Sequence, residues 1–160
     1  MQYQDELRVK HLIDYYQQRI FALAIYLIGG NHDKAYDIAT SSFAKMIQAF
    51  SIFEGEKLFL TKLASAVVEK SRNIKAIPQA DSFDFEDRSP ERRKYLQIIN
   101  TGLQALPFDE KVLLLLRDQL HLSYSDIANI LRMPERNVRI QTVQVRREFR
   151  KKIEEILSGA

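Results

Sequence analysis

Apolar residues in the first half of the chain recur every three or four positions, which is the spacing of amphipathic helices. Three such stretches predict helices over about residues 5–28, 31–50 and 57–71. The Gly-Gly-Asn segment 29–31 ends the first helix, and residues 53–56 form a turn before the third. We expect the three helices to close a small bundle around their apolar stripes.

The periodic pattern lapses between residues 75 and 92. This segment carries the acidic residues Asp81, Asp84, Glu86 and Asp87 and few apolar ones. A stretch of that composition cannot bury enough surface to offset the entropy lost on ordering. The sequence therefore predicts an acidic, solvated linker over 75–92, which joins a first domain, 1–74, to a second, 93–160.

Helical spacing returns after the linker. Ser89 is suited to an N-cap and Pro90 to the first helical position, so a fourth helix is expected to open there. A fifth helix follows Pro107, and its run 112–116 is apolar nearly all round, as expected for the central helix of a compact domain. The predicted fold class is all-α, with two small helical domains.

The segment 122–152 reads as two helices joined by a sharp turn. Ser123, with Asp126 three residues on, has the spacing of a capping box and predicts a short first helix. Pro134 disfavours helical conformation at Met133 and suits the start of a second helix. Short helix, three-residue turn and long helix form a helix-turn-helix, in which the second helix enters the major groove of DNA.

The second helix of this pair carries most of the positive charge. Residues 132–152 include eight basic and two acidic residues, in a chain whose net charge is +3. Val138, Thr142, Val145 and Phe149 fall on one stripe, which predicts the buried face. The candidate DNA-binding residues are Arg136, Asn137, Arg139, Ile140, Val143, Gln144, Arg146, Arg147, Arg150 and Lys151. The alternative is an ordinary solvated helix of a bundle.

The composition argues against catalysis. The absence of cysteine excludes disulfides, thiolate metal sites and cysteine nucleophiles. The three histidines lie far apart, and the glycines form no phosphate-binding loop, so we expect no cofactor, no metal and no enzymatic activity. The most hydrophobic run, 20–30, is too short to span a bilayer, and acidic residues precede it, unlike a signal peptide. A cytoplasmic location is expected.

Residues 106–153, LPFDEKVLLLLRDQLHLSYSDIANILRMPERNVRIQTVQVRREFRKKI, resemble bacterial RNA polymerase sigma factors of the extracytoplasmic-function group. They share the family's Leu-Pro opening, its apolar helix, its Leu-Ser-Tyr and a basic helix with an early valine. The first domain is similar over 27–50, with the Asp37-Ile38 pair and Phe43, and in the Phe-Glu-Gly turn. The resemblance thus covers nearly the whole chain.

The resemblance implies a division of labour between the domains. The first would bind the polymerase clamp and the minus-10 promoter element, and the last would bind the minus-35 element and the polymerase flap. The acidic linker would mimic nucleic acid near the polymerase active site. The implied partners are core RNA polymerase, promoter DNA and an anti-sigma factor, and the implied polymerase-binding residues are Asp37, Ile38, Thr40 and Ser41.

The chain departs from the family pattern at several positions. Thr40-Ser41 replaces the family's Gln-Glu pair, Lys62 replaces a tryptophan and Val68-Glu69 replaces Arg-Asn. In the last domain, Arg132 replaces the turn glycine, and Gln141 and Gln144 replace basic residues. Besides a promoter-specificity subunit, two alternatives stay open. One is a sigma-like mimic that binds an anti-sigma factor or regulator without initiating transcription. The other is a dimeric helix-turn-helix repressor or activator.

Overall fold

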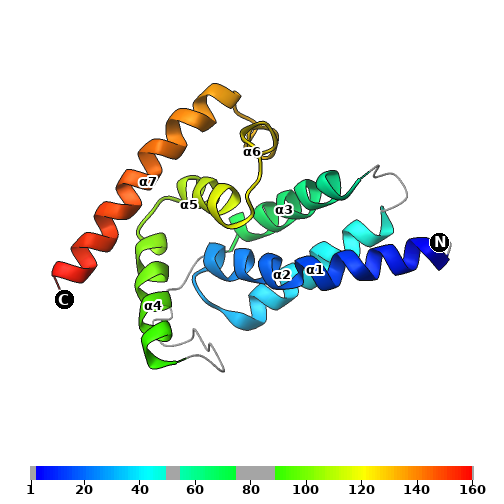
Figure 1. Cartoon of the computed structure of the whole chain (residues 1–160), viewed down its shortest axis with the longest axis horizontal. Helices are drawn as coiled ribbons and strands as arrows, with labels where there is room; N and C mark the ends of the chain where they lie inside the picture. The colour runs from blue at the N-terminus through cyan, green and yellow to red at the C-terminus, as the bar shows by residue number, and fades with distance from the viewer. Residues whose placement is uncertain (1–2, 50–54, 75–88, 160) are drawn as a thin grey trace.

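The structure is a computed structural model that describes residues 3–49, 55–74 and 89–159, with side chains from Glu6 onward (Figure 1). The described residues form helices and no strand, which confirms the predicted all-α class. The helices are α1 (Tyr3–Ile28), α2 (His32–Gln48), α3 (Glu56–Arg72), α4 (Pro90–Gln104), α5 (Phe108–Leu114), the π-helical turn η2 (Leu115–Gln119), α6 (Tyr124–Leu131) and α7 (Glu135–Ser158). None of the described helices combines the length and apolar composition that crossing a bilayer requires.

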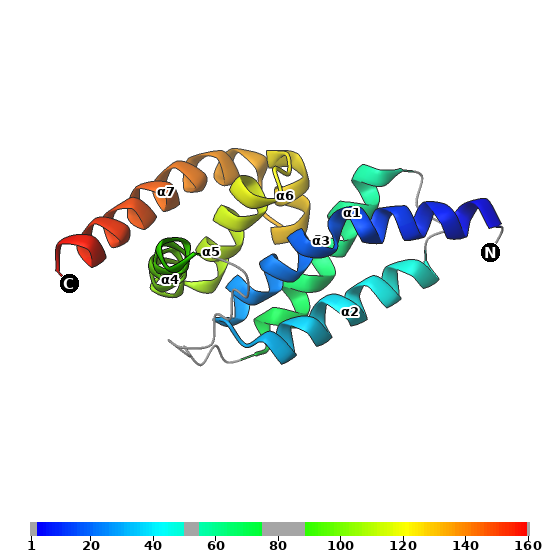
Figure 2. The same ribbon diagram turned by 60° about the horizontal axis from the view of Figure 1, so that its bottom comes forward.

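Helices α1, α2 and α3 pack on one another on one side of the molecule, and α4 to α7 lie on the other (Figure 2). The first bundle buries the apolar stripes that the sequence predicts, with Ile20, Leu23, Phe59 and Leu63 fully covered. The turn between α1 and α2 is short because Gly29 and Gly30 both adopt positive φ, where a side chain would cause strain. This turn lays α2 back along α1.

The second half is built around α5 and η2. Val112 to Leu116 are all buried, as expected for an apolar run at the centre of a domain. Helix α7 is the longest element of this half and packs against α4, α5 and α6. At the crossing of α4 and α7, Gly102 admits close contact, because a Cβ there would lie 2.7 Å from Ile153 Cδ1.

The two halves share one continuous hydrophobic core and are joined by polar contacts at its edge. Gln104 Nε2 donates a hydrogen bond of 2.8 Å to the backbone oxygen of Tyr26. Arg72 at the end of α3 pairs with Asp109 at 2.8 Å. Lys57 near the start of α3 lies 3.6 Å from the Asp126 carboxylate of α6. The last turn of α1 and both ends of α3 therefore face the second half.

The predicted helix boundaries agree with the structure to within about two residues, and the predicted caps are present. Ser89 accepts a hydrogen bond from the Arg92 N–H, and α4 begins at Pro90. The last three residues of the range assigned to the linker are thus the first turn of a helix. The linker acids Asp81, Asp84, Glu86 and Asp87 lie outside the described residues.

Candidate nucleic-acid interface

Local chemistry fixes the turn between α6 and α7. The Ser123 side chain accepts a hydrogen bond from the Asp126 N–H and caps α6, as predicted. Arg132 ends α6 in the left-handed conformation, with φ of 55°, and its N–H bonds back to the Ala128 oxygen. The Met133 N–H reaches the same oxygen at 3.1 Å. Pro134 then precedes the first residue of α7, so the chain reverses within three residues.

The inward stripe of α7 holds this helix on α5 and α6. Val138 and Thr142 are fully buried and Val145 is nearly so, while Phe149 is half-buried. The Thr142 hydroxyl donates to the Val138 backbone oxygen at 2.6 Å, so the one polar atom in the stripe is satisfied within the helix. The predicted buried face is confirmed, and the opposite face is left to solvent.

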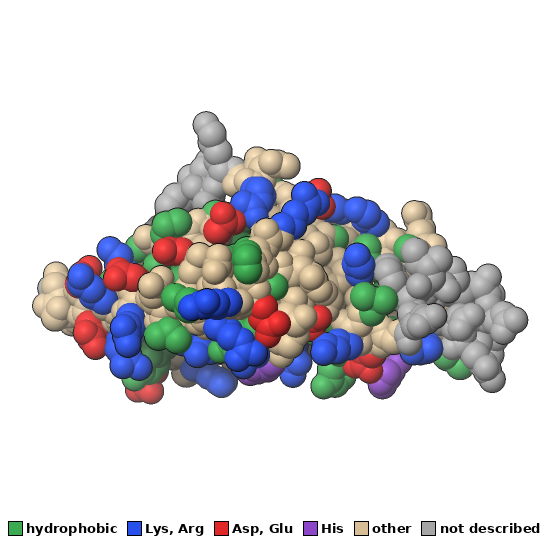
Figure 3. Space-filling model, turned by 90° about the horizontal axis from the view of Figure 1, so that it is seen from above, with side chains coloured by type: hydrophobic (Ala, Val, Ile, Leu, Met, Phe, Trp, Pro, Cys, Tyr) green, Lys and Arg blue, Asp and Glu red, His purple; other side chains and the backbone are tan. Residues whose placement is uncertain are grey.

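The outward face of α7 combines basic and aliphatic side chains. At 3.6 residues per turn, Arg136, Ile140, Val143 and Arg147 cluster opposite the buried Val138. Ile140 is 49% exposed and Val143 is 47% exposed. All ten residues predicted to bind DNA are exposed: Arg136, Asn137, Arg139, Ile140, Val143, Gln144, Arg146, Arg147, Arg150 and Lys151. Figure 3, which looks down on the side where α7 begins, shows Lys and Arg side chains interspersed with hydrophobic ones.

Arg139 and Arg146 lie about a quarter turn from the centre of that face. Both are held by carboxylates. Arg139 pairs with Glu135 on the preceding turn at 2.9 Å, and Arg146 makes a two-pronged ion pair with Asp118 of η2. The hydrogen bond to Asp118 raises the pKa of Arg146. Sequence reasoning missed Asp118, because a residue 28 positions away, just after an apolar run, gives no local sign of this contact.

The π-helical turn η2, which contains Asp118, continues the buried run at the centre of the second half. It inserts an extra residue into the turn and leads into His121, whose φ of 56° is also left-handed. Asp118 and Arg117 thereby come to lie near α6 and α7, and the Arg117 guanidinium donates to the Leu122 backbone oxygen at 2.8 Å. Helix α7 is therefore a basic helix whose flank is attached, at Arg146, to η2 of the same half.

The four residues that the resemblance assigns to polymerase binding lie on α2 in different environments. Asp37 and Thr40 are exposed, whereas Ile38 is buried in the core of the first bundle. The Ser41 hydroxyl donates to the Ile38 oxygen at 3.2 Å and accepts from Lys70 Nζ of α3 at 2.8 Å. Burial lowers the pKa of Lys70. Ser41 is exposed as well, so Asp37, Thr40 and Ser41 can all meet a partner, although Lys70 already donates to the Ser41 hydroxyl.

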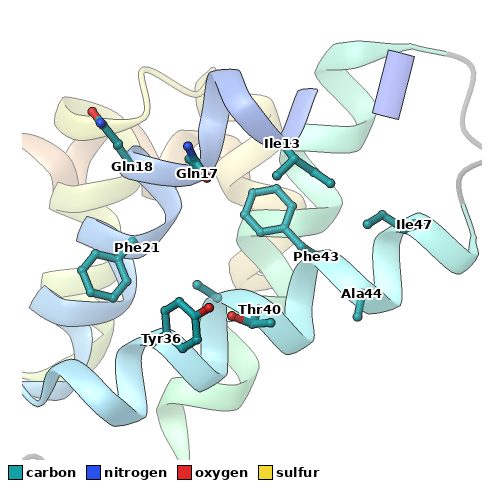
Figure 4. Close-up of a pocket in the computed structure, with 10 residues that line it drawn as sticks. Ile13, Gln17, Gln18, Phe21, Tyr36, Thr40, Phe43, Ala44 and Ile47 are labelled. Carbon is teal, nitrogen blue, oxygen red and sulfur yellow. The ribbon is translucent and has the colours of Figure 1, made fainter. Parts of the chain in front are cut away.

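Thr40 also lies on the wall of an open groove between α1 and α2, with a volume of about 540 Å³ (Figure 4). The other walls are mostly apolar, with Ile13, Phe21, Tyr36 and Phe43 facing the groove. Within the described part of the chain, no group of three or more His, Asp or Glu side chains could hold a metal ion.

Comparison with known proteins finds one matching family model and one related protein. Residues 96–149, from α4 into α7, match the family model described as sigma-70, region 4. The RNA polymerase sigma-H factor of Pseudomonas aeruginosa is 27% identical over 168 aligned positions, which cover 91% of this chain and 86% of that protein. The matched family segment includes the helix-turn-helix and most of the basic residues of α7.

Proposed function

The chain is a sigma-70-like sigma factor of the extracytoplasmic-function type, and on that premise we propose that it directs RNA polymerase to promoters whose minus-35 element α7 reads. The observation that carries this proposal is the exposed outward face of α7, where basic side chains lie opposite the stripe that packs on α5 and α6. A helix anchored in this way can enter a major groove as a rigid body. The chain would supply recognition and no chemistry of its own, in the cytoplasm.

Side chains along α7 would have different tasks. Arg136, in the first turn, can reach guanine O6 and N7, and Ile140 and Val143 can contact thymine methyl groups. Arg147, Arg150 and Lys151 lie further along the helix, where phosphates follow the groove walls. The proposed minus-35 site therefore has a guanine beside a thymine-rich step.

The first half would bind the polymerase clamp through the exposed part of α2. Asp37 and Thr40 would make contact, while Ile38 would act through packing and Ser41 through its bond to Lys70. The groove beside Thr40 offers an apolar surface for a partner helix. The same half would bind the minus-10 element.

Reading both promoter elements at once requires the halves to separate. The elements are named for positions 25 base pairs apart, which corresponds to about 85 Å of duplex. The longest described helix, α1, has 26 residues and is only about 39 Å long, less than half that distance. The packed arrangement in Figure 1 would thus describe the chain before it joins a polymerase and promoter.

Co-purification with core RNA polymerase, followed by run-off transcription on genomic fragments, tests the proposal. We expect the full chain to bind the core enzyme and to add defined start sites that the core enzyme lacks. Transcripts that persist unchanged without the chain would contradict the proposal. Binding to the core enzyme without new transcripts would favour the sigma-like mimic, which the replacement of Gln-Glu by Thr40-Ser41 motivates. A dimer on a palindromic duplex would favour a repressor or activator.

A further inference from the structure

Tyr124, the first residue of α6, lies between two arginines from different elements. The Arg117 guanidinium of η2 lies over its ring, with Cζ 4.1 Å from the ring centroid. The Arg139 guanidinium of α7 also lies over the ring, with Cζ 5.0 Å from the centroid. Guanidiniums stack on aromatic rings through dispersion and the ring quadrupole, so one tyrosine here joins three consecutive elements.

Both arginines are held at a second point. The Arg117 guanidinium donates to the Leu122 backbone oxygen at 2.8 Å. This hydrogen bond holds the guanidinium against the loop that leads into α6. Arg139 pairs with Glu135 at 2.9 Å within α7. An arginine on a solvent-exposed helix otherwise samples many rotamers, and fixing one costs conformational entropy. The Tyr124 ring and the Glu135 carboxylate hold the Arg139 side chain in place before DNA binds, so less conformational entropy is lost on binding.

The position of Arg139 gives this arrangement a consequence for DNA binding. Arg139 lies two turns before Arg146, so the two guanidiniums follow the same flank of α7, about 10 Å apart along the axis. Arg146 is held by Asp118, so each guanidinium on this flank has a partner outside α7. The walls of the major groove carry phosphates, which face the flanks of a recognition helix. The base edges form the floor of the groove and face the centre of the helix surface.

We propose that Tyr124 is a positioning residue for promoter binding: its ring, clamped by Arg117, holds the Arg139 guanidinium ready to contact a DNA phosphate. This inference rests on the proposed function of α7. The tyrosine itself need not touch DNA. Its ring face holds Arg139, so phenylalanine should keep that contact and an aliphatic residue should not. Tyr124 also interacts with Arg146 through its hydroxyl, but Asp118 holds Arg146 in either variant.

The test measures binding of the full chain to a duplex carrying a selected minus-35 element and to a scrambled duplex, over a range of salt concentrations. We expect Tyr124→Phe to bind within about twofold of wild type. Tyr124→Leu should bind both duplexes roughly three- to tenfold more weakly. Its salt slope should fall by about one unit, as for one lost phosphate contact. Tyr95→Leu, which removes an exposed tyrosine from α4, is the matched control and should change neither quantity.

A double-mutant cycle separates positioning from general damage. If Tyr124 acts through Arg139, Tyr124→Leu should cost little further affinity in an Arg139→Ala background. Losses that add fully, or a Tyr124→Phe variant as weak as Tyr124→Leu, would overturn the inference. If Tyr124→Leu fails to fold, Arg139→Lys decides, because lysine keeps the charge without the planar stack. It should bind at least threefold more weakly, and binding equal to wild type would overturn the inference.

The clamp can also be observed without DNA. Ring currents should shift the Arg139 side-chain NMR resonances in wild type and Tyr124→Phe, and the shift should vanish in Tyr124→Leu. Absence of the ring-current shift in wild type would overturn the inference. A wild-type chain that shows the shift but does not distinguish the two duplexes would instead contradict the proposed function, and with it the use of the clamp. The two failures are therefore distinguishable.

Discussion

Lys111 on α5 donates a hydrogen bond of 2.9 Å from its ammonium group to the backbone oxygen of Leu27 in the last turn of α1. The same ammonium donates to Gln104 Oε1 at 2.8 Å. Backbone oxygens in the last turn of a helix have no partner within the helix, and the negative end of its dipole favours a cation there. A side chain of the second half thus caps a helix of the first, in a position that is 96% buried from solvent by the joined halves.

Burial lowers the pKa of Lys111 to about 8, and this predicts a pH dependence of stability. In the unfolded chain the group titrates near 10.4, so between about pH 8 and 10.4 the unfolded state binds more protons than the folded one. The contribution of Lys111 to the free energy of unfolding should therefore rise with pH through that window, by roughly 2–3 kcal/mol. A neutral amine still has two N–H groups, so both hydrogen bonds survive deprotonation.

The measurement compares urea unfolding of wild type and Lys111→Met at pH 7, 8, 9 and 10. Other groups titrate in this range. Tyr16, whose pKa burial and the Glu56 hydrogen bond raise to about 12, lowers stability above pH 10 in both proteins. The difference between the two proteins isolates Lys111 and should grow in favour of wild type as pH rises. Parallel curves would show that Lys111 keeps its ordinary pKa in the folded chain, because only then do the folded and unfolded states bind the same number of protons.

Arg132 predicts a stabilising substitution. Its φ of 55° places a side chain in the left-handed region, at a cost of about 1 kcal/mol that glycine avoids. Arg132→Gly should therefore raise the free energy of unfolding by about that amount, which urea denaturation would measure. Arg132→Ala, which keeps the Cβ, is the control and should give no such gain. Equal effects of the two substitutions would mean that the charge at this position, and not the backbone, sets the energy.

Much of this fold can be predicted from the sequence because its signals are local. The caps at Ser89 and Ser123, the breaks at Gly29 and Pro134 and the buried stripe of α7 all depend on neighbours within a few residues. They appear in the structure as expected. The candidate DNA surface follows from the same periodicity, since the face opposite a buried stripe is exposed.

The contacts that were not predicted are distant in sequence. Lys111 would be assigned to solvent by its charge, yet its partner at Leu27 is 84 residues away. Asp118 lies just after the apolar run, in a π-helical turn that changes the direction of its side chain. Periodicity assumes a regular helix and so does not predict that direction. The sequence likewise contains no sign that Ser41 bonds to Lys70 across two helices. Such pairings depend on how whole helices dock.

Thr40 and Ser41 predict how the chain binds core polymerase. They stand where the family has Gln-Glu, so we expect Thr40→Gln combined with Ser41→Glu to tighten binding. Thr40 is exposed beside the groove, and a glutamate at 41 would face Lys70. The affinity of the full chain for core polymerase, measured by a fluorescence titration, checks this. Gln48→Glu, at the far end of α2, is the control. No change with the double substitution would remove this part of α2 from the polymerase interface.

The outward face of α7 predicts two kinds of DNA-binding variant. Arg136→Ala should cost roughly 1–3 kcal/mol on the preferred minus-35 site and little on other sequences, because a guanidinium on guanine is a base-specific contact. Arg147→Ala should weaken binding to all sequences alike and lower the salt slope by about one unit, because a phosphate contact is independent of sequence. Titrations of preferred and scrambled duplexes at several salt concentrations distinguish the two. Identical behaviour of both variants would show that Arg136 does not read a base.

A substitution of Ile140 distinguishes two roles for the outward face of α7. Branched aliphatic side chains are unusual on an exposed basic helix, and they can either contact thymine methyl groups or dock a protein. If α7 reads a thymine-rich step, Ile140→Ser should lower affinity for the preferred duplex and leave the scrambled one unchanged, and Val143→Ser should do the same. Leu157→Ser, on an exposed aliphatic residue near the end of α7, is the control for lost apolar surface. Unchanged DNA affinity and specificity in Ile140→Ser, together with loss of a co-purifying protein, would instead assign this face to a protein partner.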